Sequence, residues 1–395
     1  MPVAAGPLPA ASPGPPADST VADGTVADGT VADGTVADGA GGDGSAAEPD
    51  GAWSDGKTAT FRLADPGRRL AGVRLWQEVR IPADQLGFRR SGDDWRLDIT
   101  RPPVNRMEYL YELRYPDGRT QLVTDPAGSR LAPGAFGEKS VLEFPEYEPP
   151  RWLTAATEPG GGDTFELPVR ALGEAVSVRT WAPAGTAAGE PLPLLVAHDG
   201  PEYAALAGLT SYLAAGVAGG WLPRLRAALL APGPRDRWYS ANTRYTRALT
   251  QVVIAALTGR LATTVTVGMG ASLGGLAMLH AHCRYPGVFG ALFLQSGSFF
   301  RPSLDAHERG FPYYPRIVRF TGSIQHGSLP DHPVPVALTC GVIEENAGNN
   351  RLMAQTMRAA GYPVTLHEVP DMHNYTAWRD AFDPHLTRLL ARVSP

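Results

Sequence analysis

One stretch decides the fold of this chain: Val265-Thr266-Val267-Gly268-Met269-Gly270-Ala271-Ser272-Leu273-Gly274-Gly275. The β-branched residues over 264–267 predict a buried strand, and the residues over 276–282 favour a helix. Between them lies Gly-x-Ser-x-Gly, the pattern of a nucleophile elbow. In such an elbow a serine occupies a strained strand-to-helix turn, and glycines are needed because strand and helix approach closely. The pattern is also compatible with a glycine-rich turn that has no catalytic role. Residues elsewhere in the chain are needed to distinguish the two interpretations.

Composition excludes several classes of protein. The chain has 395 residues, 43% of them hydrophobic, which is enough for two or three domains. Its net charge of −5 provides no basic field for nucleic acid. The two cysteines, Cys283 and Cys340, lack metal-type spacing, so we expect free thiols, no metal site and no cofactor. No apolar run is long enough to cross a membrane and no signal peptide is apparent, so we expect a cytoplasmic protein without a membrane partner.

The chain divides into three regions. Residues 1–52 contain four copies of Thr-Val-Ala-Asp-Gly and few large apolar side chains, which predicts a disordered acidic tail. Residues 53–150 contain short alternating segments separated by Gly and Pro, which predict an all-β, immunoglobulin-like sandwich. Its clearest strands are expected at 73–76, 95–99 and 109–115.

Residues 151–395 alternate between strand and helix patterns, so we predict an α/β domain around a parallel sheet. Ligands of such sheets bind at the carboxyl ends of the strands. The expected strands are 176–181, 192–197, 225–230, 264–267, 291–294, 334–339 and 364–369. The expected helices are 203–213, 246–261, 276–282, 350–360 and 377–393, with a loop-rich segment over 299–333.

A serine needs a base to become a nucleophile, and the base needs an acid to orient it. Glu344 and Glu345 follow the strand at 334–339, and His373 follows the strand at 364–369. Both loops reach the sheet edge expected for Ser272, and the order Ser, acid, His is that of α/β-hydrolases. We therefore predict Ser272 as nucleophile, His373 as base and Glu344 as acid. Glu345 and Asp371 remain alternatives for the acid.

Other histidines are weaker candidates for the base. His198 also ends a strand, but it precedes the serine and adjoins the loop expected to hold the oxyanion. His280 and His282 follow the elbow on the helix, where packing or surface roles are expected.

The second half resembles a family of α/β-hydrolase esterases that includes esterase D, the feruloyl esterases and the mycolyltransferases, and within it the enterochelin (ferric siderophore) esterase-like branch. The resemblance spans about residues 55–395 and implies the same triad, Ser272, Glu344 and His373. The matching residues are 198–203, 270–275, 340–346, 373–375 and 378–380, with 125–126, 136–137 and 149–152 in the β region.

The oxyanion site departs from the family pattern at one position. Relatives use the backbone N–H of the residue after Asp-Gly, but here that residue is Pro201, which has none. Leu273 can still donate its N–H. The second donor must come from Gly200, Glu202 or a side chain.

The resemblance implies a serine esterase that acts on a small-molecule carboxylic ester, with a ferric siderophore trilactone as a candidate. For such an anionic substrate we expect binding by Arg235, Arg237, Trp238 and Tyr239, although these arginines could equally be solvated surface residues. An acyltransferase of the same fold, acting on a sugar or alcohol, is the alternative function, and a non-catalytic binding protein is a third. The sequence does not indicate an oligomeric state.

Overall fold

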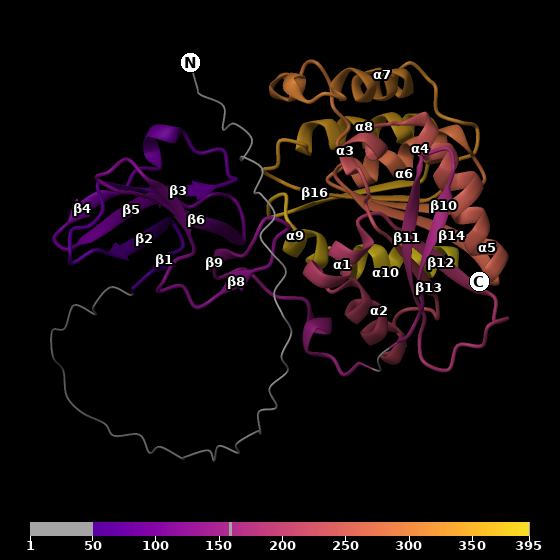
Figure 1. Ribbon diagram of the computed structural model, residues 1–395, viewed down its shortest axis with the longest axis horizontal. Helices are drawn as coiled ribbons and strands as arrows, with labels where there is room; N and C mark the ends of the chain where they lie inside the picture. Colours follow the sequence, from indigo (N-terminus) through magenta and orange to yellow (C-terminus); the bar gives the residue numbers. More distant parts are fainter. Residues whose placement is uncertain (1–49, 158–159, 395) are drawn as a thin grey trace, which may run out of the picture. The chain divides into compact units, whose positions relative to one another are not determined.

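The computed structural model describes residues 50–157 and 160–394 (Figure 1). The expected disordered tail falls on residues 1–49 for nearly all its length, and these lie outside the described residues. The described part consists of an all-β sandwich followed by an α/β-hydrolase fold, as predicted. None of its helices is long and apolar enough to cross a bilayer.

The sandwich has two antiparallel sheets that enclose one apolar core. One sheet has the order β1-β2-β5-β4, and the other has the order β3-β6-β9-β8 with β7 also beside β6. The core contains alternate residues of both sheets, such as Phe61, Leu97, Tyr109 and Tyr111. The three strands predicted most clearly are present as β3, β5 and β6. The strands are β1 (Ala52–Ser54), β2 (Thr58–Ala64), β3 (Gly72–Gln77), β4 (Arg89–Ser91), β5 (Asp94–Thr100), β6 (Arg106–Arg114), β7 (Thr120–Val123), β8 (Leu131–Ala132) and β9 (Lys139–Glu143), with the short helix η1 (Ala83–Gln85) between β3 and β4.

The hydrolase region is built on an eight-stranded sheet of order β10-β11-β13-β12-β14-β15-β16-β17. Six neighbouring strands, β13, β12, β14, β15, β16 and β17, are parallel. At the other edge β11 pairs antiparallel with both β13 and β10, so the expectation of a parallel sheet is corrected there. The strands are β10 (Thr164–Val169), β11 (Glu174–Trp181), β12 (Leu192–Ala197), β13 (Arg226–Leu230), β14 (Thr263–Ala271), β15 (Ala291–Gln295), β16 (Val336–Gly341) and β17 (Val364–Val369).

Helices cover both faces of this sheet (Figure 1). Along β12, Leu194 and Val196 pack into one core, and Leu195 and Ala197 pack into the other, because successive side chains of a strand point to opposite faces. Strands buried on both faces account for the continuous apolar runs in the sequence. The helices are η2 (Arg151–Thr154), α1 (Gly200–Leu206), α2 (Leu209–Ala218), α3 (Arg235–Tyr239), α4 (Thr243–Ala248), η3 (Leu249–Ile254), α5 (Ala255–Arg260), α6 (Leu273–Arg284), η4 (Ala306–Gly310), α7 (Tyr314–Gln325), α8 (Ala347–Ala359), α9 (Tyr375–Asp380), η5 (Phe382–Leu386) and α10 (Thr387–Val393).

Three helix expectations need correction. The helix expected over 203–213 is two helices, α1 and α2, because Gly208 takes a left-handed conformation (φ +61°) between them. The segment at 299–333 is not only loop, since it contains α7. The closing helix is interrupted at Asp383, whose backbone is extended (φ −106°, ψ 124°).

Candidate active site

Ser272 lies at the predicted strand-to-helix turn, between β14 and α6. Its backbone is strained for a residue with a side chain (φ 55°, ψ −124°). A Cβ at Gly270 would lie 2.5 Å from the backbone carbon of Gly274, and one at Gly274 would lie 3.2 Å from Cβ of His198. The two glycines therefore allow the close crossing of strand and helix that places Ser272 at the carboxyl edge of the sheet.

His198 supports the elbow from behind. Its side chain is fully buried, Nδ1–H donates to the carbonyl of Gly274 (3.0 Å), and the hydroxyl of Tyr245 donates to Nε2 (2.8 Å). Burial lowers the pKa of His198 to about 4, so the ring is neutral. Both ring nitrogens of His198 thus form hydrogen bonds within the core. His280 and His282 are also buried, and burial lowers the pKa of each to about 4.

His373 and Glu344 form the pair expected of a base and its orienting acid. The Nδ1–H of His373 donates to Oε2 of Glu344 at 2.9 Å. Glu344 follows β16, His373 follows β17, and these two strands are neighbours in the sheet. Gly341 allows the two loops to approach, because a Cβ there would lie 2.3 Å from the carbonyl oxygen of Asp371.

Two further residues hold Glu344, and neither was assigned this role from the sequence. Oε1 of Glu344 accepts from the hydroxyl of Ser296 (2.7 Å) and from the backbone N–H of Gly341 (2.7 Å). Trp378 Nε1–H donates in turn to Ser296 Oγ (2.9 Å), and its ring packs edge-on against His373. The carboxylate is therefore fixed on both oxygens and its direction toward the imidazole is set.

The electrostatics of the pair favour a charged imidazole. Burial opposes ionisation of Glu344, but His373 and the donated hydrogen bonds bring the pKa of this carboxyl below its ordinary value of 4.5. Burial likewise opposes protonation of His373, yet the Glu344 carboxylate raises the pKa of the imidazole above its ordinary 6.5. An imidazolium formed during a reaction would be stabilised here.

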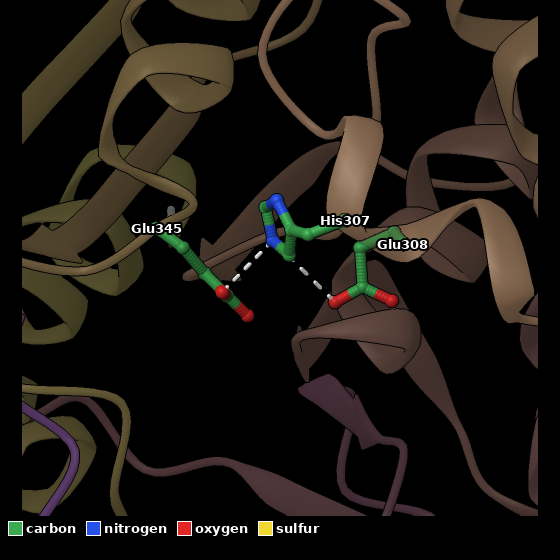
Figure 2. Close-up of side chains that lie close together, drawn as sticks. All are labelled: His307, Glu308 and Glu345. Carbon is green, nitrogen blue, oxygen red and sulfur yellow. Dashed lines mark ion pairs between the residues drawn. The ribbon is translucent and has the colours of Figure 1, made fainter. Parts of the chain in front are cut away.

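The alternative acids face other partners. Glu345 Oε2 lies 2.9 Å from Nε2 of His307, which is also 3.9 Å from Oε1 of Glu308 (Figure 2). The ligand atoms of these three residues lie within 4.8 Å of one another, but His307 and Glu345 are exposed and already paired, so we assign no metal to them. Asp371 points to the sandwich, where it pairs with Arg106 (3.1 Å).

Ser272 and His373 line the same two adjoining cavities, of about 540 and 180 Å³. The Oγ of Ser272 lies 3.1 Å from Oγ of Ser298, and the two hydroxyls form a hydrogen bond. Among the described residues this is the only side-chain hydrogen bond of Ser272. The larger cavity is walled on one side by the sandwich, which contributes Lys139 and Phe136, an aromatic side chain that is 94% exposed. The smaller one extends from Ser272 toward Glu345 and is lined mainly by hydrolase loops.

The residues predicted to stabilise the oxyanion are Leu273, Gly200 and Glu202. Leu273 is the first residue of α6, so its N–H has no partner within the helix and is free to face an oxyanion. Gly200 is buried against β13, where a Cβ would lie 2.4 Å from Cα of Leu229. Glu202 lines the larger cavity, and its buried Oε2 has no hydrogen-bond partner among the described residues. Burial, with Asp199 nearby, raises the pKa of Glu202.

Of the four predicted substrate-binding residues, Arg235 alone lines the larger cavity. It is bound by two hydrogen bonds to Asp199, both 2.9 Å, so its charge is largely compensated. Arg237 pairs with Glu174 at the surface. Trp238 and Tyr239 are buried in the hydrolase core, because their rings pack on Tyr245, and neither offers a face to a ligand.

Comparison with known proteins agrees with this geometry. Residues 170–307 match the family model Esterase ("Putative esterase"), a match that includes Ser272 but ends before Glu344 and His373. No curated protein matched the sequence.

Among solved structures, the enterobactin esterase from Shigella flexneri, crystallised in the presence of enterobactin, is similar with a TM-score of 0.68 and 18% identity over 85% of this chain and 92% of that chain. The ferric enterobactin esterase from Salmonella typhimurium gives 0.69 and 21% over 86% of this chain and 94% of that chain. A ferulic acid esterase gives 0.50 and 14% over 59% of this chain and 99% of that chain. The family model and the shared fold both agree with the resemblance stated from the sequence.

Proposed function

We propose that the protein is a serine hydrolase of carboxylic esters that works through an acyl-enzyme. The observation that supports this most strongly is the pair of Glu344 and His373 beside a strained serine on one cavity. The match to the esterase family model gives the same class of reaction from independent grounds. No cofactor is needed for this chemistry.

In the proposed mechanism, Nε2 of His373 accepts the proton of Ser272 as Oγ attacks the ester carbonyl carbon. The N–H of Leu273 and a second donor from residues 200–202 stabilise the oxyanion. The imidazolium then protonates the departing alcohol and leaves an acyl-serine. Water, deprotonated by His373, attacks this acyl group and releases the acid. Glu344 stays ionised throughout and stabilises the imidazolium.

The proposal is tested by labelling with a fluorophosphonate probe and by hydrolysis of short p-nitrophenyl esters. We expect one label per chain, located on Ser272 by peptide mass, and ester turnover that the label abolishes. Labelling elsewhere, or turnover that persists in the labelled protein, would refute the assignment. Added methanol or glycerol in the same assay separates hydrolysis from acyl transfer, because a transferase would form the corresponding new ester.

The charges at the larger cavity bear on the substrate. It is lined by six carboxylate residues (Glu78, Glu108, Asp199, Glu202, Glu344 and Glu345) and by three cationic ones (Arg80, Lys139 and Arg235). Lys139 pairs with Glu78 (2.7 Å) and Arg235 with Asp199, so of the three cations only the exposed Arg80 forms no ion pair among the described residues. The carboxylates outnumber the cations around the cavity.

A ferric trilactone remains a candidate because the similar structures include one crystallised with enterobactin. The cavity charges nevertheless favour an uncharged ester over the strongly anionic ferric complex. We therefore expect the iron-free trilactone, and neutral aryl esters, to be hydrolysed with a higher kcat/KM than the iron complex. Mass spectrometry of the products across this series checks the order, and a preference for the ferric form would reverse this interpretation.

A further inference from the structure

The loop that carries His373, residues 370–374, is held by the sandwich as well as by its own domain. The backbone N–H of Asn105 donates to the carbonyl of Pro370 at 2.7 Å. The side chain of Met372 is 2% exposed and belongs to the apolar core of the sandwich. Two residues that precede His373 in the chain, Pro370 and Met372, are therefore held by the sandwich.

Arg106, at the start of β6, makes the polar part of this contact. Its side chain is 2% exposed, and Nη1–H donates to Oδ2 of Asp371 and to Oδ1 of Asn374, both at 3.1 Å. Asp371 Oδ1 accepts from the N–H of Met372 (2.7 Å) and from the amide of Asn374 (3.2 Å). One guanidinium therefore binds side chains on both sides of His373.

The strand geometry explains why an arginine is buried there. Met107, Tyr109 and Tyr111 point into the sandwich core, so Arg106 and Glu108 must point to the opposite face of β6. The loop at 370–374 covers that face, and Glu108 (2.6 Å) supplies a second carboxylate for the guanidinium.

A chain of alternating charges continues from this cluster to the cavity. Glu108 lies 3.5 Å from Lys139, and Lys139 lies 2.7 Å from Glu78; all three residues line the larger cavity. Arg106 thus pairs with the loop of His373 and, through Glu108 and Lys139, is linked to the sandwich residues that line the cavity.

We propose that Arg106 of the sandwich is a positioning residue for the base, acting through Asp371 and Asn374 to hold the His373 imidazole against Glu344 in the cavity that Ser272 lines. The inference rests on the proposed function. It gives the sandwich a part in the chemical step, in addition to walling the cavity.

The test uses two mild variants of the full chain, Asp371→Asn and Arg106→Lys. Asp371→Asn keeps the shape of the loop but presents an amide donor to the guanidinium, and Arg106→Lys keeps the charge but cannot bind all its partners at once. We expect kcat on a p-nitrophenyl ester to fall about 10- to 100-fold, because a base displaced by about 1 Å loses this much. KM should change by less than about twofold, since substrate contacts are retained.

A second readout separates positioning from a loss of folded protein. Proton NMR follows the titration of His373, identified by comparison with His373→Gln. We expect the pKa of His373 to move down toward 6.5 in both variants, because the imidazole is less well aligned with Glu344. A partly unfolded sample would lose active enzyme without shifting this titration in the folded molecules.

Arg90→Met is the matched control. Arg90 forms an ion pair of the same type with buried Asp65 (2.6 Å), and both of its partners, Asp65 and Trp95, lie within the sandwich. This variant should lower thermal stability and leave the kcat per folded molecule and the His373 titration unchanged.

Full kcat together with an unchanged His373 titration in Asp371→Asn and Arg106→Lys would overturn the proposal. Equal effects from Arg90→Met would overturn it as well, because they would show a general response to a weakened sandwich. Failure of the proposed function looks different: the wild type would hydrolyse no ester and Ser272 would take no fluorophosphonate. In that case the NMR titration would still show whether Arg106 positions the His373 imidazole.

Discussion

The turn that presents Ser272 and the loop that presents His373 are built in opposite ways. The turn is made by residues within a few positions of one another, Gly270 to Gly275, with His198 packed behind. The loop at 370–374 depends on residues distant in the chain, namely Glu344 in its own region and Arg106, Asn105 and the apolar core of the sandwich. Both deliver a side chain to the same cavity.

This difference separates two kinds of preorganisation. The proposed nucleophile, Ser272, is fixed by the local chain path, so it should tolerate changes elsewhere in the molecule. The proposed base, His373, is fixed by contacts across two regions, so it should respond to substitutions far from its own side chain. Substitutions in the turn and in the loop should therefore have different effects.

The largest effect is expected on the side of the turn. Ser272→Ala removes the nucleophile, and kcat for p-nitrophenyl esters should fall roughly 10⁶-fold. Ser298→Ala is the matched control, because it removes only the hydroxyl to which Ser272 Oγ is hydrogen-bonded. Its kcat should fall by less than about tenfold. Comparable losses in the two variants would argue that Ser298 shares the chemistry.

The next effect is expected on the side of the loop. Glu344→Gln leaves the shape of the site but removes the charge that orients His373, and kcat should fall about 10⁴-fold. Glu345→Gln changes an exposed neighbour that pairs with His307, and its effect in the same assay should be below about twofold. The reverse order would transfer the role of the acid to Glu345.

Gly270→Ala tests the close crossing on which the turn depends. Its Cβ would lie 2.5 Å from backbone atoms of Gly274, and we expect a loss of about 3 kcal/mol in the free energy of unfolding. Gly259→Ala, in α5, meets no atom within 4 Å and should stabilise the protein by up to about 1 kcal/mol. Chemical denaturation of the two variants measures both values, and equal stabilities would contradict the crowding argument.

The smallest effect concerns pH. His373 accepts a proton only when neutral, and its pKa is raised by Glu344. Activity should therefore be full at alkaline pH and fall as the pH drops through a midpoint above 6.5. In Glu344→Gln the midpoint of the residual activity should move down, because the stabilising charge is gone. A wild-type midpoint below 6.5 would show that burial outweighs the carboxylate.

The two sides also differ in how far the sequence predicts them. A strand, the glycines and a helix are adjacent in the sequence around Ser272, so the turn could be predicted from local patterns. The proposed triad could be predicted as well, because its three residues follow strands in the chain order Ser, acid, His. Glu344 could be favoured over Glu345 but not separated from it, because the difference lies in the contacts of Ser296, Gly341 and His373.

The roles of Trp238 and Arg106 could not be predicted for the same physical reason. Trp238 looked like a stacking face because it lies among arginines in the sequence, yet tertiary packing buries it against Tyr245. Nothing in the sequence around Arg106 indicates a role for it, because only the docking of a distant loop turns that face of β6 into an interior. The antiparallel pairing of β10 and β11 likewise depends on strand neighbours that periodicity does not encode.

The contact of Arg106 with Asp371 spans 265 positions of the chain, and this has a consequence for biosynthesis. The sandwich leaves the ribosome before the α/β region and can fold while that region is still being translated. The turn of Ser272 follows, and the loop of His373 is translated after both. A nascent chain arrested before residue 370 would thus hold the serine turn without its proposed base, so we expect hydrolytic competence to appear only after residues 370–374 have been translated.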